Sequence, residues 1–395
     1  MENMYLTRKA IRKLPGTIMK TVPIPEPEII EGFGCRSQIG RICRESGFDT
    51  VLILTDKLLC ELGYLEAVER SLETEGIRYK VFDGITTEPR LEYIETGRSI
   101  ALESSTKCII TLGGGSVMDT GKMVASGCRL KHLPVDMLLQ KFLIVPEKSL
   151  PIIVVPSTAG TGAEVTVGAV ITQRNGGKFA SVIVGLNVHT VFLDSELSLN
   201  SPWNITASCG IDALSHGLEG AVADVRSSQF DIEKSRQCVR LVLENLPKLK
   251  EHPEDIAARG AMCLAANLGG NAINKQLAGY VHAFAHSIGA KYHIPHGKAI
   301  AMCLMPVMRS QRESCTIQLS ELAHFCNYDN VDALFRSLES VIALCDLKLD
   351  GSIINPGDFK DLSIAIAKDS VNYSAPLVFP RKQIISILSE INKQK

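Results

Sequence analysis

The first 160 residues alternate short apolar runs with amphipathic stretches, and this alternation constrains the fold more than any other feature. The strand-like runs and the helical patterns between them lie, in chain order, at 50–56, 64–75, 79–85, 91–103, 107–115, 116–127 and 150–162. Parallel strands need a crossover connection of a dozen or more residues, which is usually a helix. The pattern therefore predicts an α/β half with a parallel sheet covered by helices.

The second half has a different pattern, in which apolar residues recur every three to four positions along extended stretches. These stretches lie at 227–249, 254–270, 299–311, 330–347 and 380–393. Such spacing is typical of amphipathic helices. Because 395 residues exceed one ordinary core, we expect an α/β domain over 1–200 and an all-helical domain over 201–395. A ligand site is expected in the cleft between such domains.

Composition indicates an ordinary soluble protein. Apolar residues make up 45%, charged residues 22%, and the net charge is −1. This balance disfavours nucleic acid or a membrane surface as the main partner, and no apolar run approaches the ~20 residues that span a bilayer. The first twenty residues lack the apolar core of a secretory signal, although a transit peptide stays open. Twelve cysteines without CxxC pairs indicate reduced thiols. We expect a cytoplasmic homo-oligomer, by default a dimer.

Two helical pairs and a Pro-His-Gly triplet carry ligand-capable side chains. Asp212 and His216 are four residues apart, as are His282 and His286, and His296 lies within the triplet. Residues four apart lie on one helical face. A carboxylate with several imidazoles suits a divalent transition metal such as iron or zinc. The sequence therefore predicts a metal site.

The alternative to a metal site is that these aspartate and histidine residues have only structural roles. A histidine on an apolar helix face is more often a hydrogen-bonded core residue, and an Asp/His pair four apart is often a surface or capping interaction. However, the apolar neighbours Ile211, Leu214, Val281, Phe284 and Ala285 indicate that both helices are buried. Unpaired polar groups there are costly, so a shared metal is the favoured interpretation.

Two glycine-rich loops follow predicted strands. The sequence GGGSVMDTGK (113–122) lies between a strand and a helix, where backbone N–H groups and the helix dipole attract a pyrophosphate. It matches neither GxGxxG nor a Walker loop, and a tight turn without a ligand is the alternative. The loop at 156–166 is suited to a diphosphate or ribose. Asp56 ends the first strand, where a carboxylate favours NAD over NADP, unless it only caps the next helix.

Seven short motifs occur along the chain in the same order, and at nearly the same spacing, as in one known protein family. They are TD at 55–56, GGGSxxD at 113–119, PSTAGTGAE at 156–164, DxEL at 194–197, GxDALxH at 210–216, GYVHAxAH at 279–286 and PHG at 295–297. With them the chain resembles the iron-containing (group III) alcohol dehydrogenase family, which is related in fold to dehydroquinate synthase and glycerol dehydrogenase. The resemblance runs from about Pro23 to the C-terminus, and it implies the dehydroquinate synthase-like fold.

The resemblance also implies a role for individual residues. It assigns the metal to Asp212, His216, His282 and His296, and places His286 near the nicotinamide and substrate as the candidate catalytic residue. Spacing alone would instead have made His286 a ligand. The implied cofactor contacts are Asp56, Gly113, Gly114, Gly115, Ser116, Asp119, Thr158, Thr161, Lys178 and, more weakly, Leu197.

The function implied is an NAD-linked, metal-dependent oxidoreductase that interconverts a small alcohol and its aldehyde or ketone by hydride transfer. The metal, Fe(II) or Zn, acts as a Lewis acid. The alternative is a dehydroquinate synthase-like or glycerol dehydrogenase-like enzyme that uses zinc and NAD on a polyol or phosphorylated substrate. A phosphate would need several converging basic residues, and the helical half offers only Lys275, Lys291 and Lys298. Glu88 and Lys275 depart from the family pattern, so the resemblance does not identify the substrate.

Overall fold

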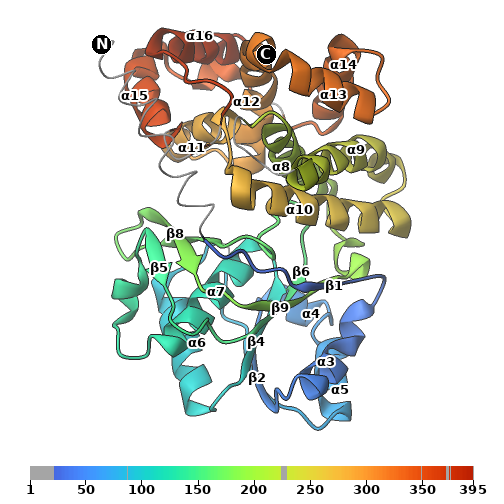
Figure 1. The fold of residues 1–395 in the computed structure, drawn as a ribbon, viewed down its shortest axis with the longest axis vertical. Helices are drawn as coiled ribbons and strands as arrows, with labels where there is room; N and C mark the ends of the chain where they lie inside the picture. Colours follow the sequence, from blue (N-terminus) through green and yellow to red (C-terminus); the bar gives the residue numbers. More distant parts are fainter. Residues whose placement is uncertain are drawn as a thin grey trace. The chain divides into compact units, whose positions relative to one another are not determined.

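The computed structural model describes residues 22–86, 88–223, 229–347, 349–370, 373 and 375–394, with backbone alone at 229–230 and 275–276 (Figure 1). The N-terminal segment considered as a signal or transit peptide therefore lies outside the described residues. So do residues 227–228, at the start of one predicted helix, and the side chain of Lys275.

Six strands form one fully parallel sheet, as the alternating sequence pattern predicted. In spatial order they are β1 (Glu28–Glu31), β9 (Val188–Leu193), β6 (Ile152–Pro156), β4 (Cys108–Gly113), β2 (Thr50–Leu54) and β3 (Arg78–Phe82). Every residue of β2, β4 and β6 is buried. Continuous apolar runs are typical of strands that are covered on both faces.

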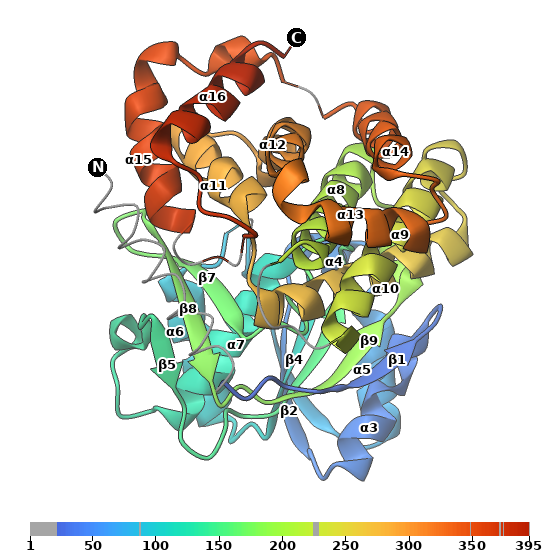
Figure 2. The ribbon, with the colours of Figure 1, turned by 45° about the horizontal axis from the view of Figure 1, so that its top comes forward.

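Helices cover both faces of this sheet (Figures 1 and 2). On one face the buried side chains of Val51 and Ile53 join a core with α3 (Ile39–Glu45) and α5 (Glu66–Thr74). On the other face Leu54 contacts α6 (Leu91–Glu103) and α7 (Gly115–Arg129). Successive side chains of a strand point to opposite faces, so each buried strand contributes to both cores.

A second, three-stranded sheet was not predicted. It comprises β5 (Phe142–Ile144), β8 (Lys178–Val184) and β7 (Gly168–Thr172), with β5 and β8 parallel and β7 and β8 antiparallel. Its strands alternate buried and partly exposed residues, so they lack the continuous apolar runs that marked the larger sheet. The turn between β7 and β8 contains Asn175-Gly176, a dipeptide typical of hairpins.

Contacts divide the chain into an α/β unit and a helical unit. The α/β unit contains Pro23–Thr158 and Gly162–Asn200, and the helical unit contains Ser201–Lys395 together with the loop residues Ala159–Thr161. The principal helices of the helical unit are α8 (Trp203–Ala221), α9 (Gln229–Glu251), α10 (Ile256–Gln276), α11 (Tyr280–Tyr292), α12 (His296–Gln311), α13 (Thr316–Phe325), α14 (Val331–Leu344), α15 (Phe359–Asp369) and α16 (Arg381–Asn392). The predicted combination of an α/β part and a helical part is confirmed.

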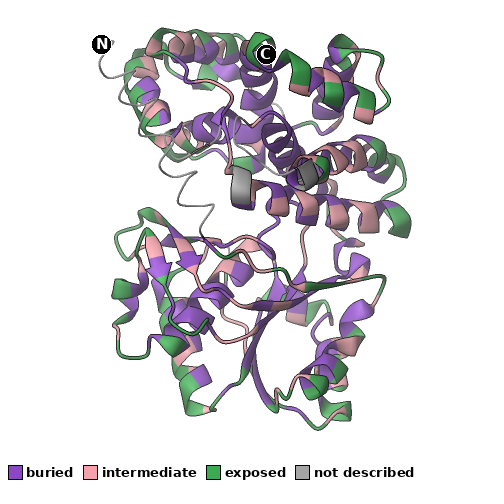
Figure 3. Ribbon diagram, in the orientation of Figure 1, coloured by how far each residue is buried: buried purple, intermediate pink, exposed green. Residues whose placement is uncertain are grey.

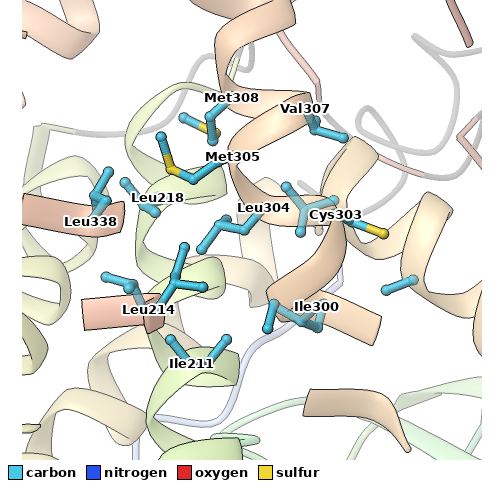
Figure 4. Packing of buried hydrophobic residues seen from close by; sticks show 14 of the residues in the cluster. Ile211, Leu214, Leu218, Ile300, Cys303, Leu304, Met305, Val307, Met308 and Leu338 are labelled. Carbon is cyan, nitrogen blue, oxygen red and sulfur yellow. The ribbon is translucent and has the colours of Figure 1, made fainter. Parts of the chain in front are cut away.

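Helix α8 lies in the core of the helical unit and is buried along most of its length (Figure 3). Its apolar stripe of Ile211, Leu214 and Leu218 packs in one cluster with Ile300 and Leu304 of α12 (Figure 4). The spacing of three and four residues places this stripe on one side of the helix. No helix among the described residues is long and apolar enough to cross a membrane.

Candidate active site

A second stripe on α8 is polar. Asp212, His216 and Glu219 follow each other at spacings of four and three residues, so they lie on one face of the helix. All three side chains are buried. Burying polar groups is unfavourable unless they find partners, and α11 and α12 supply them.

Glycine and proline bring the start of α12 against α8. Pro295 precedes the helix, and His296 is its first residue. A Cβ at Gly297 would overlap Ser208 Oγ and lie 2.9 Å from Ser208 Cα, so only glycine fits this approach. Ser208 lies one turn before Asp212 on α8. The Pro-His-Gly triplet therefore positions His296 next to the polar stripe of α8.

Three imidazole nitrogens surround one carboxylate oxygen. Nε2 of His296 lies 3.2 Å from Asp212 Oδ1, and Nε2 of His216 and of His282 each lie 3.7 Å from it. The ligand atoms of Asp212, His282 and His296 also lie within 4.8 Å of one another. Ligands held about 2.0–2.2 Å from a tetrahedral metal are separated by about 3.3–3.6 Å. The structure thus brings the four predicted ligands together around Asp212 Oδ1, and Asp212, His282 and His296 lie at mutual spacings that suit a metal.

Two of these atoms lack hydrogen-bond partners. Asp212 Oδ1 and His282 Nε2 are both buried, and neither forms a hydrogen bond within the described part of the chain. A buried polar atom without a partner is rare because its desolvation is uncompensated. A divalent cation that binds both atoms would provide the missing interaction, so the residues present fit a metal ion.

The protonation of the site follows from burial and neighbouring charge. Burial raises the pKa of Asp212, but the imidazoles of His216 and His296 outweigh this effect and hold the pKa well below its usual range. Burial lowers the pKa of His216 to about 4. Burial also lowers the pKa of His282, but the carboxylates of Glu219 and Asp212 outweigh it and raise the value to about 10. Asp212 is therefore anionic and His216 neutral at pH 7, both suited to bind a cation.

Glu219 contacts the site, although no sequence motif had singled it out. Its Oε2 accepts hydrogen bonds from His282 Nδ1 at 2.6 Å and from the backbone N–H of Gly279 at 2.8 Å. Its position three residues after His216, on a helix predicted to be buried, was the signal available. A carboxylate on such a face requires a partner.

His286 lies beside the proposed ligands. Its ring stacks on His296 with 5.3 Å between centroids, and its Nδ1 lies 3.1 Å from the hydroxyl of Tyr373. That hydroxyl in turn donates to Asp369 Oδ2 at 3.1 Å. Burial and the charge of Asp369 raise the pKa of Tyr373 well above its usual range, so the phenol stays protonated. Neither Tyr373 nor Asp369 carried a sequence signal, because folding alone brings them to His286.

In the α/β unit, the glycine loop lies between β4 and α7 as predicted. Gly114 is the N-terminal capping residue of α7, and no side chain caps the helix there. A Cβ at Gly114 would lie 3.4 Å from Thr158 Oγ1, so the second predicted loop adjoins the first. Gly115 and Ser116 form the first residues of α7, at the helix end whose dipole favours an anion. This arrangement suits a bound phosphate. Thr161, another predicted cofactor residue, belongs to the helical unit according to its contacts.

The remaining predicted cofactor residues have contacts of their own. Asp56 Oδ1 accepts from the backbone N–H of Leu59 and caps α4 (Lys57–Glu61). Asp119 accepts from Lys122 Nζ at 3.0 Å and from the backbone N–H of Val170 at 2.9 Å.

Two further predicted contacts lie at opposite extremes of exposure. Lys178 is exposed and forms an ion pair with Glu88 at 3.1 Å. The pair places a cation beside the acidic residue that departs from the family pattern. Leu197 is buried in the core on the α3 and α5 face of the sheet.

Residues 26–195 match the iron-containing alcohol dehydrogenase family, and residues 206–391 match the C-terminal part of the Fe-containing alcohol dehydrogenase family. The chain belongs to the iron-containing alcohol dehydrogenase family. The resemblance inferred from the seven motifs is confirmed, because these matches cover most of both units.

Individual members of the family match nearly the whole chain. A probable alcohol dehydrogenase, EutG, from Salmonella typhimurium is 30% identical over 358 residues, covering 90% of this chain and 87% of its own. A crystal structure of 1,3-propanediol oxidoreductase has a TM-score of 0.85 at 26% identity, covering 94% of this chain and 100% of its own. Sulfoacetaldehyde reductase from Bifidobacterium kashiwanohense in complex with NAD+ has a TM-score of 0.88 at 25% identity, covering 95% and 99%.

Membership in the iron-containing alcohol dehydrogenase family gives the reaction class. The protein is an oxidoreductase that interconverts an alcohol and its aldehyde or ketone with a nicotinamide cofactor. The predicted fold class is confirmed by the same structural neighbours.

Proposed function

We propose that Asp212, His216, His282 and His296 bind one divalent metal ion, and that the protein oxidises a small alcohol, or reduces the aldehyde or ketone, with NAD(H). The observation that carries the proposal is the position of three imidazole Nε2 atoms 3.2–3.7 Å from Asp212 Oδ1. Iron(II) and zinc both accept three imidazoles and one carboxylate. The family makes iron the first choice, with zinc as the alternative.

The chain's residues prepare the site for an alcohol. A divalent metal held there supplies Lewis-acid chemistry, which lowers the pKa of an alcohol and polarises a carbonyl. The Tyr373 hydroxyl donates to Asp369, and its oxygen accepts from His286 Nδ1–H. This tautomer leaves His286 Nε2 as a hydrogen-bond acceptor. We assign His286 the catalytic role of accepting or returning the alcohol proton.

NAD is the proposed cofactor, and hydride transfer is the chemistry that it supplies. The uncapped start of α7 suits the pyrophosphate, and the carboxylate of Asp56 disfavours the extra 2′-phosphate of NADP. The α/β-unit residues proposed to bind or support the cofactor are Asp56, Gly113, Gly114, Gly115, Ser116, Asp119, Thr158, Lys178 and Leu197, with Thr161 from the adjoining loop.

A lyase reaction on a phosphorylated substrate has no specific support. It would require several cations that converge on a phosphate, and Lys291 instead forms an ion pair with Asp358 at 2.9 Å. We therefore keep the substrate as a small alcohol or carbonyl compound.

The proposed setting is a cytoplasmic homodimer. All twelve cysteines are free thiols, which fits a reducing compartment. Two-fold dimers are the commonest oligomers of soluble proteins. Light scattering of the purified protein measures the oligomeric state directly, and a monomer would contradict this part of the proposal.

The metal assignment is tested by alanine substitution of single ligands. We expect His282→Ala and His296→Ala each to lose metal content and at least about a hundredfold in kcat/KM, while NAD+ still binds because nine of its ten proposed residues lie in the α/β unit. Metal is measured by elemental analysis, and cofactor binding by NADH fluorescence. Full metal content and full activity in either variant would refute the assignment.

The metal and the substrate are identified in one further experiment. Elemental analysis of the purified protein reports iron or zinc, and NADH fluorescence follows turnover with a panel of small alcohols and aldehydes. Turnover of a phosphorylated substrate without net change in NADH would favour the lyase instead.

A further inference from the structure

The carboxylate of Glu219 joins helix α8 to the start of helix α11 through three short hydrogen bonds. Oε1 accepts from the backbone N–H of Val281 at 2.6 Å. Oε2 accepts from the backbone N–H of Gly279 at 2.8 Å and from His282 Nδ1 at 2.6 Å. Glu219 and His282 are both buried, so water does not compete for these bonds.

We propose that Glu219 is a positioning residue for the metal centre, which orients the imidazole of His282 and fixes its tautomer. This inference rests on the proposed metal site. A carboxylate only accepts hydrogen bonds, so it requires a proton on His282 Nδ1. Nε2, which lies 3.7 Å from Asp212 Oδ1, is then the nitrogen that can exchange its proton for the metal.

The two backbone hydrogen bonds hold the carboxylate in place. Gly279 is the N-terminal capping residue of α11, and Val281 is the second residue of the helix. Their N–H groups lie at the helix end that favours a negative charge. Glu219 therefore binds the helix that carries His282 as well as the imidazole itself, and one carboxylate fixes both the position and the rotation of the ring. Carboxylate partners of this kind typically contribute ten- to hundredfold to metal affinity.

The glycine at position 279 is required by the same contact. A Cβ there would lie 2.5 Å from Glu219 Oε1 and 2.8 Å from its Cδ. The backbone of Gly279 has a φ of −130°, which lies outside the left-handed region that favours glycine. A Gly279→Ala substitution therefore acts mainly by displacing the Glu219 carboxylate, which makes it an independent probe of the same interaction.

The alternative is that Glu219 only caps α11. The two roles are separated by comparing metal-free and metal-loaded protein. Glu219→Gln keeps the size of the side chain but replaces one oxygen with an amide donor, so at least one of the three hydrogen bonds is lost. A lost helix cap lowers the melting temperature with and without metal equally. A disturbed ligand instead reduces the stabilisation that metal binding adds, since that increment depends on the dissociation constant.

The experiment uses the full chain, stripped with a chelator and titrated with Zn2+, and then with Co2+ for its visible absorption. We expect Glu219→Gln and Gly279→Ala each to bind Zn2+ ten- to hundredfold more weakly, to show a smaller rise in melting temperature on Zn2+ addition, and to alter the Co2+ spectrum. Gly168→Ala is the matched control, because a Cβ at Gly168 meets only open space. It should match the wild type in all three measurements.

Several outcomes would overturn the proposal. If Glu219→Gln binds Zn2+ as tightly as the wild type with an unchanged Co2+ spectrum, Glu219 is a helix cap only, even where the melting temperature falls. If Glu219→Gln does not fold, unchanged Zn2+ affinity in Gly279→Ala leads to the same conclusion. If the wild-type protein binds neither Zn2+ nor Co2+, the proposed metal centre does not exist. That result would refute the proposed function together with this inference.

Discussion

At the scale of the residue, the metal centre depends on one carboxylate oxygen. Asp212 Oδ1 is buried, lacks a hydrogen-bond partner among the described residues, and has three imidazole nitrogens within 3.7 Å. Surface Asp/His pairs four residues apart do not explain such an atom, since solvent would satisfy it. Burial therefore favours the metal interpretation over the capping interpretation that the sequence left open.

Asp56 provides a residue-scale prediction for the cofactor. Its Oδ1 caps α4, and asparagine caps helices as well as aspartate does. Asp56→Asn therefore keeps the cap and removes only the charge. We expect the ratio of kcat/KM for NADP+ to that for NAD+ to rise about tenfold or more, because a like charge no longer opposes the 2′-phosphate.

Steady-state kinetics with both cofactors measures this ratio. An unchanged ratio at unchanged melting temperature would show that the carboxylate does not face the ribose, and that its role is the helix cap alone.

At the scale of the element, helix α8 combines two functions. One stripe, with Ile211 and Leu214, packs in the apolar core, and the other, with Asp212 and His216, carries two of the proposed metal ligands. Gly217 permits a close approach of α9, because a Cβ there would lie 3.0 Å from Ser235 O. The helix is thus held on several sides, and this fixes the ligands before any metal binds.

Gly297 provides the prediction at this scale. Alanine at this position would force the start of α12 away from Ser208 on α8, and His296 would move with it. We expect Gly297→Ala to lower the free energy of unfolding by about 1–3 kcal/mol, as overpacking does, and to reduce the metal content of the purified protein. Chemical denaturation and elemental analysis measure the two effects. Normal metal content in this variant would show that His296 does not need the close helix contact.

At the scale of the whole molecule, the two units supply different chemistry. The α/β unit carries the glycine loop and Asp56, and the helical unit carries every proposed metal ligand. Because the ligands come from α8, α11 and α12, metal binding should stabilise the helical unit by linking three helices. Removing the metal exposes the protonation preferences of the ligands themselves.

The metal-free protein should therefore be most stable near pH 6.5. The pKa of His216 is lowered from 6.5 to about 4. As pH falls from 6.5 to 4, the unfolded chain gains a proton that the folded protein does not, and stability is lost. The pKa of His282 is raised from 6.5 to about 10. As pH rises from 6.5 to 10, the folded protein keeps a proton that the unfolded chain loses, and stability again falls.

Melting temperatures between pH 5 and 9 in the presence of a chelator measure this dependence. We expect a maximum near pH 6.5 that changes when Zn2+ is added, because the metal replaces the proton on His282. A melting temperature that rises steadily across the range would contradict the protonation states assigned to the two histidines.

Local patterns were sufficient to predict much of the fold. The apolar runs that became β2, β4 and β6 are buried on both faces, so their signal did not depend on their neighbours. The predicted helix at 91–103 has the bounds of α6. The sheet of β5, β7 and β8 was not predicted, because its short half-exposed strands gain their stability from pairing rather than from burial.

For the candidate site, the structure gives His282 and His286 different partners, which their spacing in the sequence could not predict. Spacing placed His282 and His286 on one face and favoured both as ligands, and only the family resemblance set His286 apart. In the structure, His286 Nδ1 faces Tyr373, while His282 Nδ1 faces Glu219. Helical periodicity cannot distinguish two positions one turn apart, so the proposed roles of the two histidines rest on the residues packed against each ring.

The sequence by itself determined the fold class, the family and the residues able to bind a metal, because each depends on the kinds of side chain and their spacing along the chain. Only the tertiary structure decided which of these side chains meet. Asp212 and His296 are 84 positions apart, and Glu219 and Val281 are 62 apart. Contacts over such separations arise from helix packing, in which a glycine without a Cβ fixes how closely two helices approach.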